Sequence, residues 1–104
     1  MAELIKIYWR DIPSQVMAKA GRKAERVMLS SRFQEGIDRA AMRAGKGTSE
    51  AYMEDWKRLR EPLSGDLKSA ATEAAAQLEA EFDDDFLERV VKAKGVIADV
   101  KDNG

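Results

Sequence analysis

Leu-Ile-Lys-Ile-Tyr-Trp-Arg, at residues 4–10, alternates apolar and polar side chains, and this stretch decides the class of fold. The alternation is typical of a β-strand with one buried face, which here carries Ile5, Ile7 and Trp9. Pro13 ends this strand and opens a turn, because proline lacks a backbone donor. The chain therefore begins with a strand and not with a helix.

Residues 15–20 predict a second strand and residues 24–29 predict a third. Gly21 begins the turn between them, since glycine adopts positive φ at little cost. The expected product is a hairpin with a basic tip. Alanine is a weak strand former, so a helix over residues 14–28 is the competing interpretation, which Gly21 near its middle disfavours.

From Ser30 onward the spacing of apolar residues changes from two to about 3.6, which indicates helices. The first is expected to begin with a capping box at Ser31 and Gln34. A second, capped by Thr48 and extending toward residue 60, carries Tyr52, Trp56 and Leu59 on one face. The ranges 66–82 and 84–94 predict two further helices, and residues 96–104 are expected to be a loosely held tail.

These elements predict one α+β domain over residues 1–104. A small three-stranded antiparallel meander at about residues 4–29 is followed by three or four helices at about 31–94, packed on one face. The main rival is an all-helical bundle with the first strand as an arm. The expected core comprises Ile5, Ile7, Trp9, Val16, Val27, Leu29, Phe33, Ile37, Ala41, Tyr52, Trp56, Leu78, Phe82, Leu87 and Val91.

The composition excludes much ordinary enzyme chemistry. The 104 residues include no cysteine and no histidine, so a thiolate nucleophile and the usual neutral general base are absent. No glycine-rich phosphate loop is present, and Asp83, Asp84 and Asp85 are better explained as the cap of a helix than as a metal site. We expect a protein that is not an enzyme, needs no cofactor and, lacking any membrane-spanning run or signal sequence, is cytoplasmic.

Charge is divided unevenly along the chain. The formal net charge is −1, but residues 1–47 carry about +5 and residues 48–104 about −6. Such asymmetry can mark a face that binds a partner, or the two halves can simply attract each other on folding. The candidate interaction surface comprises Lys19, Arg22, Lys23, Arg26, Arg10 and Asp11.

Basic residues next to aromatic ones allow a second interpretation, in which the basic hairpin and the first helix bind nucleic acid. Aromatic rings stack on bases and cations contact phosphates. The overall pI of about 5.5 opposes this interpretation. The few aromatic residues are also needed for the core of a small domain.

Two stretches carry a resemblance to a known family. Tyr8-Trp9-Arg10-Asp11-Ile12-Pro13 and the run from Ile37 to Gly45, Ile-Asp-Arg-Ala-Ala-Met-Arg-Ala-Gly, resemble the bacterial "virulence factor" domain family. Ser31 to Gln34 and Tyr52 to Trp56 are similar to it as well, so that the resemblance covers about residues 4–92. Such domains form small alphaproteobacterial proteins and the C-terminal domain of a larger conserved virulence factor.

The resemblance implies an accessory or interaction role and a link to corrinoid and folate methyl-transfer systems, and it supplies no catalytic residue. We therefore expect a non-catalytic accessory module that binds a protein partner. A nucleic-acid-binding module is the alternative, and the protein could also pair with itself as a homodimer.

Overall fold

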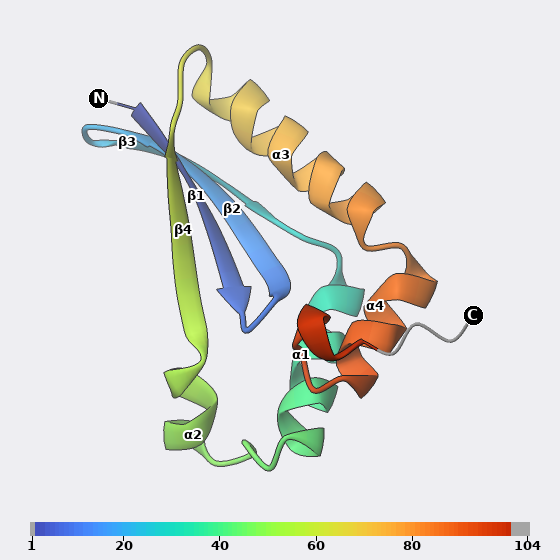
Figure 1. The fold of residues 1–104 in the computed structure, drawn as a ribbon. Helices are drawn as coiled ribbons and strands as arrows, with labels where there is room; N and C mark the ends of the chain where they lie inside the picture. Colours follow the sequence, from blue (N-terminus) through green and yellow to red (C-terminus); the bar gives the residue numbers. More distant parts are fainter. Residues whose placement is uncertain (1, 101–104) are drawn as a thin grey trace.

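The computed structural model describes residues 2–100 and shows an α+β fold built on one antiparallel sheet. Its strands are β1 (Ala2–Trp9), β2 (Ile12–Ala20), β3 (Lys23–Met28) and β4 (Trp56–Pro62). Their order across the sheet is β3-β2-β1-β4, so β3 and β4 form the two edges (Figure 1). The strands expected in the first thirty residues are confirmed, but the turn expected at Pro13 is wrong, because Arg10 and Asp11 form the turn and Pro13 lies inside β2, paired with Tyr8.

The helices are α1 (Ser31–Arg43), α2 (Ser49–Glu54), α3 (Leu67–Glu81) and α4 (Asp84–Lys92), followed by the short 3₁₀ helix η1 (Ile97–Asp99). Figure 1 shows α3 running alongside the sheet, while α1, α4 and η1 gather at the end where β1 turns into β2. The helix α2 lies directly before β4, at that same end. No helix in residues 2–100 is long and apolar enough to cross a membrane.

Small side chains bring α3 close to the sheet. Ala71, Ala74 and Ala75 are buried, and Leu78 continues the same side of the helix. They belong to one core cluster with β2, in which Val16 and Ala18 are completely buried. Alanine keeps the helix stable and lets its backbone approach the strands. One face of the sheet is thereby covered.

The helix expected from Thr48 toward residue 60 is wrong beyond Glu54. Thr48 does cap α2, accepting a hydrogen bond from the Ala51 amide at 3.3 Å. The chain then extends as β4 and pairs with β1, so the sheet has four strands instead of three. Pairing with β1 satisfies a row of backbone groups that would otherwise be unpaired, and this outweighs the helical spacing of the aromatic residues.

Two further expectations are corrected. The N-cap of α1 is Ser30, one residue earlier than predicted, and its hydroxyl bonds Glu79 without capping the helix. Val96–Val100 is not a free end, because the Ile97 amide donates to a carboxylate oxygen of Asp11 at 2.8 Å. The rest of the predicted tail, residues 101–104, lies outside the described residues.

Most of the expected core is confirmed, but Ile5 and Ile7 lie on the face of the sheet away from α3 and outside the core cluster, in which Leu4 takes the place expected for them. Trp9, Phe33 and Ile37 are among the most deeply buried side chains, whereas Tyr52 and Trp56 pack against the core with part of their surface exposed. The additional buried residues that composition did not single out are Leu4, Ile12, Ala18, Ala40, Ala71, Ala74, Ala75 and Val90. Several are alanines, which are buried because α1 and α3 each pack closely against β2 and not because the residues are large.

Candidate interaction surface

The face of the sheet that points away from α3 has no helix over most of its area. The strand register places its side chains together, because directly paired residues point to the same side. We call this surface the open face. It comprises Glu3, Ile5, Ile7, Gln15, Met17, Lys19, Ala24, Arg26, Met28, Arg58, Arg60 and Pro62.

Apolar side chains lie in the middle of the open face. Ile5 is only 4% exposed although no helix covers it, because its cross-strand neighbours Met17 and Arg60 flank it with long side chains. Met28 on the edge strand is 61% exposed. The open face therefore combines an apolar centre with flexible methionine and arginine side chains, which can reorganise around a bound partner.

The charge of the open face is positive and largely uncompensated. Arg60 bonds Glu3 at 2.7 Å. Within residues 2–100, no ion pair forms at Lys19, Arg26 or Arg58. Like charges without acidic partners repel one another, so they favour binding of a negatively charged surface.

The hairpin tip extends this positive surface. Ala20 pairs with Lys23, which leaves Gly21 and Arg22 as a two-residue loop. Gly21 has φ +61°, as expected for a turn that matches the twist of the strands. Arg22 and Lys23 are exposed and, among the described residues, form no ion pair. Of the four predicted residues in this hairpin, Lys19 and Arg26 point to the open face, Arg22 lies in the loop, and Lys23, opposite Ala20, points to the side of α3.

Arg10 and Asp11 lie elsewhere, in the turn between β1 and β2 at the opposite end of β2 from the tip. Arg10 donates to Asp55 at 3.1 Å and to the Lys94 carbonyl at 2.8 Å. Asp11 pairs with Lys57 at 3.1 Å. These contacts hold α2, β4 and the segment after α4 to the end of the sheet. The structure gives both residues an internal, connecting position and does not bring them to the hairpin tip.

An apolar recess opens where α2 meets the open face. Its volume is about 400 Å³, and it is lined by Ile7, Gln15, Tyr52, Met53, Trp56, Lys57 and Arg58. The Trp56 and Tyr52 rings meet edge to face at 5.7 Å. The buried Oε1 of Gln15 accepts no hydrogen bond from any described residue, which is uncommon for a buried polar atom. The sequence did not reveal this recess because it depends on β4.

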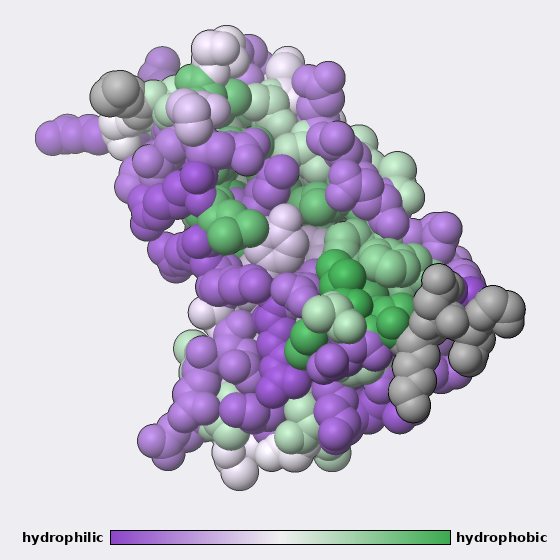
Figure 2. All heavy atoms as spheres, in the orientation of Figure 1, coloured by the Kyte–Doolittle hydropathy of each residue, from purple (hydrophilic) through white to green (hydrophobic). Residues whose placement is uncertain are grey.

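A second depression lies on the other side of β4, facing α3. It has a volume of about 230 Å³, and its apolar lining includes Tyr8, Leu59, Phe82 and Ile97. Figure 2 shows apolar side chains beside the middle of β4 and, across a paler area, over η1. Burial, together with Glu81, Glu61 and Asp11 nearby, raises the pKa of the Tyr8 hydroxyl above its usual value. Tyr8 therefore stays neutral here and offers an uncharged polar edge.

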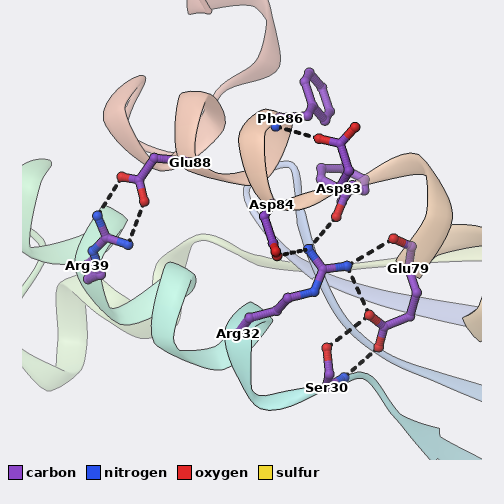
Figure 3. Close-up of polar contacts among 9 residues, drawn as sticks. Ser30, Arg32, Arg39, Glu79, Asp83, Asp84, Phe86 and Glu88 are labelled. Carbon is purple, nitrogen blue, oxygen red and sulfur yellow. Dashed lines mark hydrogen bonds and ion pairs between the residues drawn. The ribbon is translucent and has the colours of Figure 1, made fainter.

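Arg32 and Arg39 of α1 are used within the fold (Figure 3). Arg32 donates to Glu79 at 3.0 Å and to the Phe82 carbonyl, which joins α1 to the end of α3. Burial alone would raise the pKa of Glu79, but hydrogen bonds from Ser30 and Arg32 outweigh it and lower that pKa. Arg39 likewise donates two hydrogen bonds to the Glu88 carboxylate. Two cations of the helix expected to bind nucleic acid are therefore already paired with acids of the same chain.

The three consecutive aspartates begin α4, as expected from capping. The Asp83 carboxylate accepts the Phe86 amide at 2.8 Å, and Asp84 and Asp85 occupy the first turn (Figure 3). Asp84 also contacts Arg32 at 3.3 Å. Over residues 2–100, no three acidic side chains gather in a way that could hold a metal ion.

The fold and this surface define a small α+β module with one face of its sheet covered by a helix and the other open. Comparison with family models matches residues 7–91 to the family described as "Virulence factor". The match covers most of the chain, so the chain belongs to this family, as the resemblance implied. No curated protein and no solved structure matches it.

Proposed function

We propose that this protein is a non-catalytic accessory module that binds an acidic protein partner on the open face of its sheet. The observation that carries the proposal is the combination of uncompensated cations with apolar side chains on one surface, of which Met28 is exposed and Ile7 and Met17 are partly exposed. Apolar area supplies binding free energy when it is buried. The cations speed association and select against basic partners.

The hairpin tip belongs to the same binding surface. Arg22 lies in the loop beyond the sheet, at the end where Lys19 lies, and Lys23 is the first residue of β3. Electrostatic attraction there would act mainly on the association rate and would weaken as salt is raised, because the screening length falls to about 8 Å at physiological ionic strength.

The proposed role is binding and includes no reaction step. The link to corrinoid and folate methyl-transfer systems, which the family resemblance implies, stays a prediction. That link would be supported if the recovered partner were a protein of such a system. Nucleic-acid binding by the hairpin also stays a prediction, and the experiment below separates it from protein binding.

Three double charge reversals test the proposal, each changing the net charge by the same amount. Arg26→Glu with Arg58→Glu alters the open face, and Arg22→Glu with Lys23→Glu alters the tip. Arg43→Glu with Lys92→Glu is the matched control on exposed positions of α1 and α4. Stability should change little in all three, because exposed charges usually contribute under about 1 kcal/mol each.

The measurement is quantitative recovery of partners by the tagged protein from the native cell, at low and at physiological salt and with nuclease treatment. Acidic proteins should be recovered by the wild type and the control and largely lost with the open-face reversal. Equal recovery by all three variants would refute the proposal. Binding that disappears after nuclease treatment would favour the nucleic-acid alternative.

A further inference from the structure

The strand β4 is an edge of the sheet, and the outward direction of its backbone groups can be worked out. The Arg10 amide donates to the Asp55 carbonyl at 2.9 Å, and the Leu63 amide donates to the Ala2 carbonyl at 3.2 Å. Directly opposite residues of an antiparallel pair alternate between bonded and non-bonded pairs. Lys57, Leu59 and Glu61 therefore bond β1, and the residues between them point outward.

The outward positions are Trp56, Arg58, Arg60 and Pro62. Proline has no N–H group, and it occupies a position where none is needed for pairing with β1. The N–H and C=O groups of Arg58 and Arg60 thus face away from the sheet. Such a row of unpaired groups can accept an additional strand from another chain.

The two sides of β4 differ in chemistry. On the open face, Arg58 has no acidic partner among the described residues, and Arg60 forms an ion pair with Glu3. On the side facing α3, Leu59 is 51% exposed beside the depression lined by Tyr8, Phe82 and Ile97. A strand that fits both sides would alternate acidic and apolar side chains.

The other edge is less suitable. The strand β3 is packed on its inner side by α3, so an added strand would meet that helix. Pairing of β4 with β4 of a second copy is also unfavourable. In the register centred on Leu59, Arg58 of one copy would lie opposite Arg60 of the other, and like charges directly opposite destabilise a sheet. The occupant is therefore a different protein.

We infer that β4 binds an extended segment of the partner as a fifth, antiparallel strand, with acidic side chains over Arg58 and Arg60 and an apolar side chain over Leu59. This inference rests on the proposed function and specifies how the acidic partner is held. Main-chain hydrogen bonds would supply affinity, and the alternation of side chains would supply specificity.

The probe is a nine-residue peptide of alternating Glu and Val with blocked ends. Binding should slow exchange of the Arg58 and Arg60 amide hydrogens several-fold, while the Leu59 amide, which already points to β1, should change little. N-methylation of the glutamates removes the donors that face β4, whereas N-methylation of the valines removes donors that face away. Only the first modification should abolish binding.

Two variants of the protein supply an independent measurement. Arg58→Ala and Arg58→Pro both remove the guanidinium, but only the proline removes the outward N–H. We expect Arg58→Pro to bind the peptide about fivefold more weakly than Arg58→Ala, the effect of one hydrogen bond. If the proline variant is poorly folded, the N-methylated peptides decide the question with the wild-type protein.

Equal binding of both N-methylated peptides would overturn strand addition. If the peptides still shift the NMR signals of Ile7, Met17 and Arg26, the open face remains a docking surface, and only the way in which the peptide binds there differs from strand addition. Absence of peptide binding up to about 1 mM would also overturn strand addition. The charge-reversal experiment, which uses no peptide, then judges the proposed function separately.

Discussion

Replacing Gly95 by alanine tests how the C-terminal segment is fixed against the sheet. Gly95 has φ +85°, a conformation that residues with a side chain rarely adopt. A Cβ atom at this position would lie 3.1 Å from Cζ3 of Trp9 and 3.4 Å from Cβ of Arg10. Its carbonyl also accepts the Asp11 amide at 2.9 Å, so the residue cannot move away without losing that bond.

The expected loss of stability has two parts. The positive φ costs about 1–2 kcal/mol, part of which is offset because alanine also restricts the unfolded chain. Forcing a methyl group against the Trp9 ring adds about 1–3 kcal/mol, since a buried ring in a packed core has little room to shift. The total of about 2–4 kcal/mol should lower Tm by roughly 10 °C or more in a domain of this size.

Gly45→Ala is the matched control. Gly45 has φ +71°, and an added Cβ would meet nothing within 4 Å. It should therefore lose only the backbone contribution, about 1 kcal/mol. Urea unfolding followed by circular dichroism and by tryptophan fluorescence would measure both variants. Equal losses in the two variants would refute the close approach of the C-terminal segment to Trp9.

The hydrogen bonds to Glu79 predict a pH effect. The pKa of its carboxyl is lowered in the folded state, so its contribution is complete above the unfolded value of about 4.3 and is lost as pH falls through the folded value. As pH falls through that value, the free energy of unfolding should therefore decrease less for Glu79→Gln than for the wild type. Acid-unfolding curves of the two proteins that run parallel would contradict this. In a Trp56→Phe variant, the buried Trp9 ring should give blue-shifted fluorescence emission. This emission should lie at a shorter wavelength than that of Trp56 in a Trp9→Phe variant. Emission like that of free indole from the Trp56→Phe variant would show that Trp9 is exposed.

The strand β1 could be predicted because its apolar and polar side chains alternate, and β2 because buried side chains alternate with more exposed ones, whereas β3, with only Val27 packed against the core, could be predicted from the turn before it. Val16 and Ala18 alternate with more exposed neighbours in β2, and Gly21 marks the turn. The strand β4 could not be predicted in this way. As an exposed edge it has little alternation, and Leu59 falls at a helical spacing from Tyr52 and Trp56. Only pairing with β1, a contact distant in sequence, makes this segment extended.

The same reason explains which part of the candidate surface could be predicted. The basic hairpin follows from local sequence, and Lys19 and Arg26 do share a face as the strand alternation requires. Arg58 and the recess near Trp56 depend on β4 and were missed. The one local signal was Pro62, because the residue before a proline favours an extended conformation.

The distribution of charge in the folded chain also bears on what the open face binds. Many acids of the negative C-terminal half already have partners, among them Glu79 with Arg32, Glu88 with Arg39 and Asp85 with Arg89. A contact between the open face of one copy and the acidic helices of another would join two different surfaces. Such contacts form rings or open chains and not the symmetric pair of an ordinary dimer. Most cations of the open face have no acidic partner within residues 2–100, whereas these acids are paired with arginines of the same chain. This distribution favours an acidic surface supplied by another protein.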